Sequence, residues 1–476
     1  MGGKMAKLEW RWLFAIGLSM VVNFGSMVRA DDVDDYFQRE MASRRIPGLA
    51  VAVVRHGRIA RVSTYGVANL ETDTPVTAES VFAIASLDKG ITATGLLKAS
   101  EQGKIALADP ITKYVDVALP GVSVAMLLSH TSGLADMDQA MAEKYGSRLF
   151  QRYSTDDLLA AVRTASLAPP DTQFYYSDVG PFLAQLAIER STGRAWMDWM
   201  QESLFRPAGM LNVVFMHPHA IIPHRVSSYT FDAEQRLIRD DRTDVDYGPM
   251  YNDVGMTVGD FARWLILLDG HGPLSNASIK ALWTPASLAD GSPAREVYSF
   301  SGYGLGFGLD DVLGQRVILH TGHSGVAYVK FPELDLAVVV FTNLEHPQGS
   351  DPAGLALGVA GLLEPSISLR TLSAPRSGEP PAARDLRQAY EGFLAGVPDL
   401  SAYAHPLQAT MWRNRDTFRD RLPRLGSLVS WTFLRKSVVD GEPAFLFRAA
   451  HTHGELYARF SLDPQGKISR LVWWHV

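Results

Sequence analysis

The sequence predicts one α/β unit over most of its 476 residues and a small α+β unit after it. Two observations support this fold class. Strand-like segments at residues 49–66 and 304–343 enclose a middle region with helical periodicity, which favours a single sheet joining both ends of the unit. A proline-rich stretch at 366–384 then precedes regularly spaced strands, which indicates a separate domain.

The elements of the first unit follow in order along the chain. Residues 31–44 have the pattern of a surface helix, and 49–54 and 58–66 form a predicted hairpin around the His56-Gly57 turn. Residues 90–99, apolar and small throughout, predict a buried helix. Further helices are expected at 156–165, 179–192, 196–204 and 258–268, and strands at 304–309, 316–319, 326–331 and 336–343.

The domain boundaries follow from these elements. We expect a domain over 31–365, a linker over 366–384 and a small α+β domain over 385–476. Its helices are predicted at 386–395 and 407–418, and its strands at 429–435, 444–449, 456–461 and 468–474. No catalytic constellation is evident in this second domain.

Residues 1–30 are predicted to be a cleavable export signal. A basic start is followed by an apolar run at 12–24, and Val28 and Ala30 occupy the small-residue positions of a cleavage site. The run is shorter than the ~20 residues that a spanning helix needs, although an uncleaved anchor is the alternative. We expect an exported protein, periplasmic or secreted, without a stable membrane span after cleavage.

Composition excludes several classes of function. Hydrophobic residues make up 47% and charged residues 20%, as in soluble globular proteins. The net charge of -6 and the lack of a long basic run disfavour a nucleic-acid partner. The absence of cysteine excludes disulfides, thiolate metal sites and a cysteine nucleophile.

Ser86-Leu87-Asp88-Lys89 is the only place where Lys follows Ser by three positions. On a helix this spacing puts both side chains on one face. A serine hydroxyl is a poor nucleophile until a neighbouring group removes its proton, and backbone N–H groups at a helix start suit a developing oxyanion. Alone, the motif also fits an ordinary helix cap.

Two further segments gain meaning only beside Ser86. Tyr176-Ser177-Asp178 precedes a helix, where a tyrosine is usually a packing residue. The run from His320 to Gly325 (HTGHSG) lies between two strands, either as a plain hairpin or as a sheet edge whose N–H groups face the nucleophile.

In this order, the three segments resemble the serine β-lactamase and penicillin-binding family, nearest to its class C-like esterases, D-amino-acid peptidases and carboxypeptidases. Residues 127–134 (LLSHTSGL) and 303–308 (YGLGFG) support the resemblance, which covers about residues 33 to 345. It implies an antiparallel sheet flanked by helices, with a helical lobe closing the cleft. A small-molecule or peptide substrate is implied, and neither metal nor cofactor.

The resemblance also implies roles for single residues. Ser86 matches the acylated nucleophile, and Lys89 matches the residue that shares its proton and keeps Tyr176 partly ionised. Tyr176 matches the general base for acylation and the proton donor to the leaving group. The backbone N–H groups of Ser86 and His323 match the oxyanion hole.

The expected substrate-binding residues, Asp178, His320, Thr321 and Gly322, include two departures from the family pattern. Asp178 stands where Asn is usual, and a carboxylate there would stabilise the ammonium of Lys89 and oppose ionisation of Tyr176. His320 replaces the Lys that helps hold a substrate carboxylate. Esters, amides or D-amino peptides without that carboxylate are therefore the expected substrates.

The sequence allows three other interpretations. Residues 322–326 nearly match the G-x-S-x-G elbow, but Val326 replaces the last glycine and a strand follows instead of a helix. His217, His219 and His224 lack metal-site spacing. A binding or sensor domain that acylates once, or not at all, stays open because of Asp178.

Overall fold

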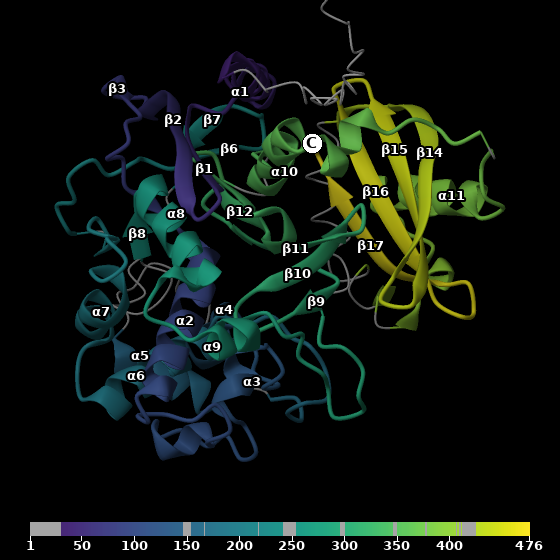
Figure 1. Cartoon of the computed structure of the whole chain (residues 1–476). Helices are drawn as coiled ribbons and strands as arrows, with labels where there is room; N and C mark the ends of the chain where they lie inside the picture. Colours follow the sequence, from purple (N-terminus) through teal and green to yellow (C-terminus); the bar gives the residue numbers. More distant parts are fainter. Residues whose placement is uncertain are drawn as a thin grey trace, which may run out of the picture.

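The structure, a computed structural model, describes residues 30–145, 154–165, 167–217, 219–240, 254–295, 300–345, 350–376, 378–405, 407–408, 411 and 425–476. Within these ranges, a larger unit is built on an eight-stranded sheet and a smaller one on a four-stranded sheet (Figure 1). Residues 1–29 of the predicted export signal, and most of the helix predicted at 407–418, lie outside the described residues. Among the helices described, none is both long and apolar enough to cross a membrane.

The main sheet joins the two ends of the larger unit, as predicted. β1 (Gly48–Arg55) pairs antiparallel with β2 (Arg58–Asn69) and with β13 (Leu336–Thr342). The strand order is β3-β2-β1-β13-β12-β11-β10-β9. The other strands are β3 (Thr74–Pro75), β9 (Gly302–Tyr303), β10 (Gly308–Val312), β11 (Gln315–Gly322) and β12 (Val326–Phe331).

The strand predicted at 304–309 is wrong in its placement. Residues 304–307 form the turn between β9 and β10 instead. Gly306 has a φ of +77°, which favours glycine, and its N–H donates to the carbonyl of Leu128 at 2.9 Å instead of to a neighbouring strand. The turn thereby fastens the sheet edge to the helical lobe.

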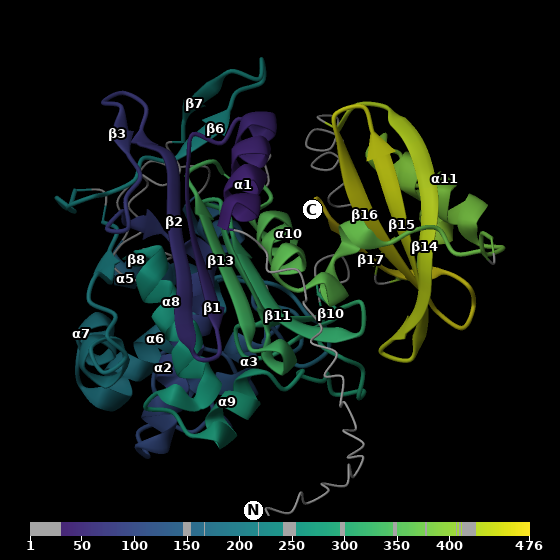
Figure 2. The same cartoon turned by 45° about the horizontal axis from the view of Figure 1, so that its top comes forward.

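Both faces of the sheet are covered, which explains why β1 is apolar without alternation. Ala50, Ala52 and Val54 belong to the core on one face, and Leu49, Val51 and Val53 to the core on the other. Figure 2 shows α1 (Ala30–Arg44) and α10 (Pro352–Leu363) on one side of these strands and α8 (Val258–Ile266) on the opposite side. Helix α10 is not among the predicted helices, because a helix that is apolar all round lacks an amphipathic period.

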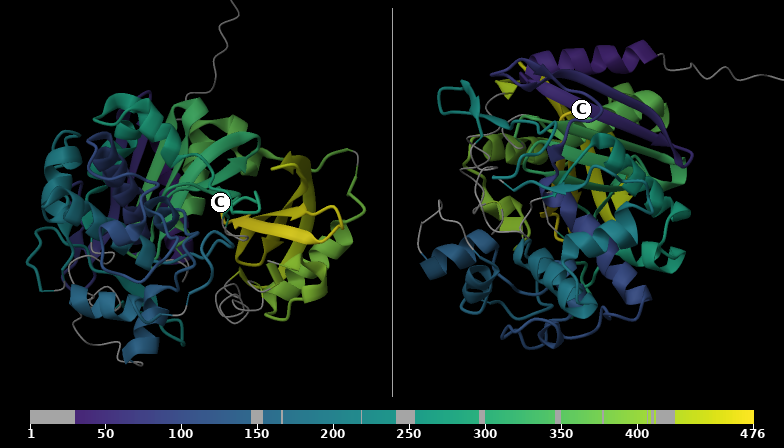
Figure 3. Two further views of the ribbon diagram at one scale, coloured as in Figure 1. Left: turned by 90° about the horizontal axis from the view of Figure 1, so that it is seen from below. Right: turned by 90° about the vertical axis from the view of Figure 1, so that its left-hand side faces the viewer.

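The helical lobe lies on the face of the sheet opposite α1 (Figure 3). Its helices are α2 (Asp88–Glu101), α3 (Val124–Leu128), α4 (Met137–Tyr145), α5 (Thr155–Val162), α6 (Val179–Thr192), α7 (Trp196–Met200) and α9 (Asn276–Leu282). Short strands also occur: β4 (Phe82–Ala83), β5 (Val214–Phe215) and β8 (Val254–Met256) form one sheet, β6 (Tyr229–Phe231) and β7 (Leu237–Arg239) another. The central helix α2 is almost wholly buried.

The smaller unit is an antiparallel sheet of β14 (Leu428–Val439), β15 (Glu442–His451), β16 (Gly454–Leu462) and β17 (Ile468–Trp474). One face packs against α11 (Ala383–Leu394) through residues such as Phe447. The other face, through Leu446 and Trp474, joins the same apolar core as Val51 of β1. The two units therefore share one core.

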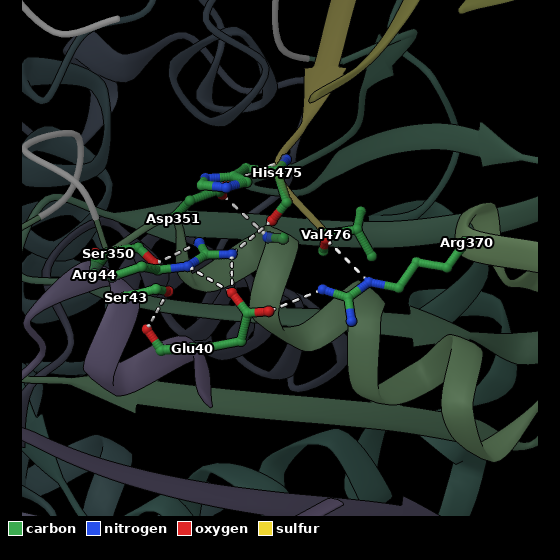
Figure 4. A network of polar contacts seen from close by, with 9 residues as sticks. Glu40, Ser43, Arg44, Ser350, Asp351, Arg370, His475 and Val476 are labelled. Carbon is green, nitrogen blue, oxygen red and sulfur yellow. Dashed lines mark hydrogen bonds and ion pairs between the residues drawn. The ribbon is translucent and has the colours of Figure 1, made fainter. Parts of the chain in front are cut away.

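A polar network beside this core links α1 to the residues after β17 (Figure 4). Arg44 donates to the carboxylate of Glu40 at 2.8 Å and to the carbonyl of His475 at 3.0 Å. Arg370 donates to Glu40 at 2.8 Å and to the carbonyl of Val476 at 3.1 Å. Burial alone would raise the pKa of Glu40, but the two guanidinium groups lower it, so the carboxylate stays charged.

Candidate active site

Ser86 lies in a 3-10 turn, Ala85–Leu87, directly before α2. The chain enters this turn from a fixed strand, because β4 pairs with β8 and the N–H of Ile84 donates to the carbonyl of Val254 at 2.9 Å. Ala85 then takes a φ of +46°, a conformation that L residues rarely adopt. This strained residue turns the chain from strand to helix and leaves Ser86 half-buried at the helix start.

Lys89 is fully buried in the first turn of α2, and its Nζ donates to Ser86 Oγ at 2.9 Å. The same ammonium forms an ion pair with Asp178. Burial alone would lower the pKa of Lys89, but the charges of Asp178 and Asp88 outweigh it and raise the pKa above its usual value. Lys89 is therefore a charged donor to Ser86 in this state and not a free base.

Asp88 is a second buried carboxyl group beside the ammonium. Burial, with the repulsion of Asp178 acting in the same direction and Lys89 opposing it, raises the pKa of Asp88 to about 7. Its Oδ1 has no hydrogen-bond partner within the described part of the chain. Asp88 is not among the predicted site residues, because a carboxylate at a helix start is usually solvated and its burial here depends on the fold.

Tyr176 and Asp178 reach Lys89 from the segment before α6, of which Asp178 is the N-cap residue. The Nζ of Lys89 lies 5.0 Å from the centroid of the Tyr176 ring. The same ring lies 4.4 Å from that of His130 and 6.2 Å from that of His320, between centroids. The first two predicted motifs thus meet at Lys89.

The end of β11 lies against the turn that carries Ser86. A Cβ added at Gly322 would lie 2.8 Å from the carbonyl oxygen of Ile84, so only glycine allows this close approach. Ser324 Oγ donates to the carbonyl of Ala83 at 2.7 Å. The exposed residue His323 lies between these two contacts, so its backbone is held next to the Ser86 turn.

His320 is buried and neutral. Its Nδ1 lies 2.8 Å from the carbonyl of Thr321, which assigns the proton to Nδ1, and its Nε2 then accepts from the hydroxyl of Tyr303 at 2.9 Å. Burial, and then the positive charge of Lys89, lower the pKa of His320 to about 4. His320 therefore adds no positive charge to the site at neutral pH.

Two aromatic residues of the site had no assigned role in the sequence analysis. Tyr303, from β9, contacts His130 and Phe174 with ring centroids 4.9 and 5.4 Å apart. Both Tyr303 and His130 occur in the two supporting segments of the resemblance, and that was the only signal for them. Their contacts arise from segments that are distant in sequence.

These groups form the kind of site used for acyl transfer to serine: a hydroxyl hydrogen-bonded to a buried ammonium, a phenol ring beside that ammonium, and the end of a strand next to the turn that carries the hydroxyl. The fold and the site together define a serine hydrolase class. The Beta-lactamase family model matches residues 33–361, and the chain belongs to this family.

Two proteins with similar sequences are named as a penicillin-binding protein and as a D-aminopeptidase. A penicillin-binding protein of Bacillus subtilis is 25% identical over 57% of this chain and 62% of its own length. A D-aminopeptidase of Gluconobacter oxydans is 23% identical over 69% of this chain and 62% of its own length. The chain thus spans less than two thirds of each of these relatives.

Solved structures show the same fold. The octameric penicillin-binding protein homologue from Pyrococcus abyssi matches with a TM-score of 0.61 and 19% identity, over 91% of this chain and 96% of its own. EstCE1, described as a hydrolase with promiscuous acyltransferase activity, matches with a TM-score of 0.59 and 21% identity, over 70% of this chain and 98% of its own.

Proposed function

We propose that the chain is an exported serine hydrolase that cleaves an ester, amide or peptide bond through an acyl-enzyme on Ser86. One observation carries the proposal: the buried, charged Lys89 donates to the Ser86 hydroxyl at 2.9 Å. Membership of the Beta-lactamase family and the names of the relatives support the class of bond.

The proposed reaction has two steps. Ser86 Oγ attacks the substrate carbonyl carbon while Tyr176, in its phenolate form, takes the hydroxyl proton, and the ammonium of Lys89 stabilises that phenolate before the transfer. The N–H groups of Ser86 and His323 hold the oxyanion, and Tyr176 returns the proton to the leaving group. Water then attacks the acyl-enzyme and releases the acid, which regenerates the Ser86 hydroxyl.

The charges around Ser86 favour substrates without a carboxylate at the recognised end. The ammonium of Lys89 is balanced by Asp178, and His320 is neutral at pH 7. Neither residue therefore offers a free cation to an anionic substrate. We expect simple esters, amides and D-amino peptides to be better substrates than penicillins.

The test compares the wild-type chain with Ser86→Ala, using a fluorophosphonate, a labelled penicillin and chromogenic esters. Ester turnover and fluorophosphonate labelling that both vanish in the variant are the expected result. A cephalosporin cleaved far faster than simple esters would contradict the substrate proposal, and turnover that survives in Ser86→Ala would contradict the nucleophile.

A second candidate function is a binding or sensor domain that acylates once or not at all. The ion pair of Lys89 with Asp178 favours it, because the carboxylate offsets the positive charge that would stabilise an ionised Tyr176. Labelling at Ser86 without turnover of any ester would support this alternative.

Export is part of the proposal and rests on the composition of residues 1–30. Expression of the full chain in a bacterium, followed by fractionation, tests it. Recovery outside the cytoplasm with an N-terminus near Asp31 is expected, and retention of the full-length chain in the cytoplasm would contradict it.

A further inference from the structure

The segment that carries Tyr176 is fastened to a second loop along most of its length. Residues 168–178 lie beside residues 130–136 and bond to them at several points. The donors and acceptors are Ala168 N to Gly133 O (2.9 Å), Asp171 N to Thr131 O (2.7 Å), Tyr175 N to His130 O (2.8 Å) and Asp178 N to Asp136 Oδ1 (3.0 Å).

His130 lies next to Tyr176, where these two segments meet, and holds the chain on both sides of Tyr176. Its carbonyl accepts from Tyr175 N at 2.8 Å, and its Nδ1 accepts from Ser177 N at 3.2 Å. Its own ring lies 4.4 Å from the Tyr176 ring, with 34° between the planes. The backbone carbonyl of His130 therefore holds the chain before the phenol, and its side chain holds the chain after the phenol and one face of the ring.

The local backbone shows that this orientation is built into the fold. His130 has a φ of +57°, which is uncommon for a residue other than glycine, and the residue is 1% exposed. Only packing that over-determines a residue maintains such a conformation, and this strain often accompanies function.

The chemistry of the imidazole suits holding and not proton transfer. Because Nδ1 accepts a hydrogen bond from a backbone N–H, the proton of the neutral ring lies on Nε2. Burial, and then the nearby charge of Lys89, keep the pKa of His130 well below its usual value. The His130 ring therefore adds no positive charge that would repel the ammonium of Lys89, whose Nζ lies 5.0 Å from the centroid of the Tyr176 ring.

We propose that His130 is a positioning residue that holds the phenol of Tyr176 beside Lys89 and Ser86. This inference rests on the proposed function, in which Tyr176 transfers the proton of Ser86. It adds a residue from a different loop to that reaction, with a role exerted through Tyr176 and not on the substrate.

Two substitutions separate the contacts of His130. His130→Phe keeps a ring beside Tyr176 but removes the acceptor for Ser177 N, whereas His130→Asn keeps an acceptor near the Nδ1 position and removes the ring. His451→Phe is the matched control, because His451 is also a buried histidine beside a tyrosine ring, with its centroid 5.9 Å from that of Tyr390, but in the smaller unit.

The measurements are the rate of fluorophosphonate acylation at Ser86, the hydrogen exchange of the Ser177 amide, and stability in urea. A misplaced catalytic group costs about 10²-fold in rate, so both His130 variants are expected to acylate about that much more slowly. His130→Phe is also expected to speed exchange at Ser177 about tenfold through the lost hydrogen bond, and His130→Asn to restore protection there. His451→Phe is expected to lose stability while its acylation rate is kept.

The outcomes are distinct. Undiminished acylation in the His130 variants, unchanged exchange at Ser177 in His130→Phe, or an acylation loss in His451→Phe equal to theirs would overturn the positioning role while leaving the proposed function intact. A wild-type chain that is not labelled at Ser86 would overturn the proposed function and this role with it.

Discussion

At the scale of single residues, Asp178 distinguishes this site from the usual pattern, in which an Asn stands at this position. Its carboxylate forms an ion pair with the ammonium of Lys89, which an anionic substrate would otherwise contact. Asp178→Asn removes one negative charge from the site and breaks the ion pair with Lys89. We expect acylation by a labelled penicillin, relative to a neutral ester, to rise about tenfold, the scale of one nearby charge at intermediate dielectric.

The control for this prediction is Asp171→Asn, the same chemical change in the same loop. Asp171 is fixed there by its backbone N–H, which donates to the carbonyl of Thr131 at 2.7 Å. Its penicillin-to-ester ratio is expected to match the wild type. An unchanged ratio in Asp178→Asn, measured by stopped-flow labelling, would contradict the electrostatic account.

Asp88 predicts a pH dependence of stability. Its folded pKa of about 7 lies above the unfolded value near 3.8, so the folded state holds the proton more tightly between these limits. Its contribution to stability therefore falls as pH rises from about 4 to 7 and is constant above. Asp88→Asn should leave stability unchanged at pH 4 and raise the free energy of unfolding by about 1–4 kcal/mol at pH 8.

Urea unfolding across this pH range checks the prediction. The exposed Asp385 provides the comparison, and Asp385→Asn is expected to give the same stability as the wild type at both pH values. A stabilisation by Asp88→Asn that is equal at pH 4 and pH 8 would show that ionisation of Asp88 is not its cause.

At the scale of elements, regular periodicity made the helices and strands predictable. The helix expected at 179–192 is α6 and the strand at 326–331 is β12, with the same bounds. The strand expected at 304–309 failed because the apolar residues there surround a turn whose glycine contacts the lobe. Such a contact is set by tertiary packing and leaves no local period.

For the site, too, local features could be predicted from the sequence and contacts between distant segments could not. The spacing of Ser86 and Lys89 is local, so the sequence alone indicates that their side chains share a face. The approach of Tyr176 and His320 could be expected only from the family resemblance, since no local pattern joins them. The burial of Asp88 could not be predicted, because it depends on side chains that arrive from other elements.

The turn between β9 and β10 offers a test of how the elements support Lys89. A Cβ at Gly306 would lie 2.6 Å from the carbonyl oxygen of Lys89. Gly306→Ala is therefore expected to cost about 2–4 kcal/mol of stability, from the positive φ and the clash together, and to slow acylation by shifting the start of α2.

Gly314→Ala is the matched control for the turn. Gly314 also has a positive φ, of +92°, but an added Cβ there would meet nothing within 4 Å. Its cost should be only the backbone strain, about 1 kcal/mol, with acylation kept. Equal effects of the two substitutions in urea unfolding and in acylation would contradict the contact with Lys89 as the cause.

At the scale of the whole molecule, buried charges hold the two units together. Arg470 of β17 is fully buried, donates to Ser301 Oγ at 2.7 Å and pairs with Asp440 at 3.0 Å. Because Asp440 is 49% exposed, the main loss in Arg470→Met is the buried hydrogen bond to Ser301, and the free energy of unfolding is expected to fall by about 1–3 kcal/mol.

Arg387→Met is the control for this interface, because the ion pair of Arg387 with Glu391 lies on the surface of α11. Its expected cost is below about 0.5 kcal/mol. Urea unfolding followed by tryptophan fluorescence measures both. A small cost for Arg470→Met would mean that the apolar core alone joins the units.

The pairing of β1 with β13 has a consequence for how this protein is made. Leu49 is synthesised early, but its partner in the sheet is Thr342 at the end of β13. Because translation proceeds at about 5–20 residues per second, this strand pairing is delayed by tens of seconds. Until then, the apolar residues of β1 lack cover on one side and β1 has an open edge. Nascent chains arrested before β13 should therefore aggregate or recruit chaperones, whereas chains arrested after it should resist proteolysis.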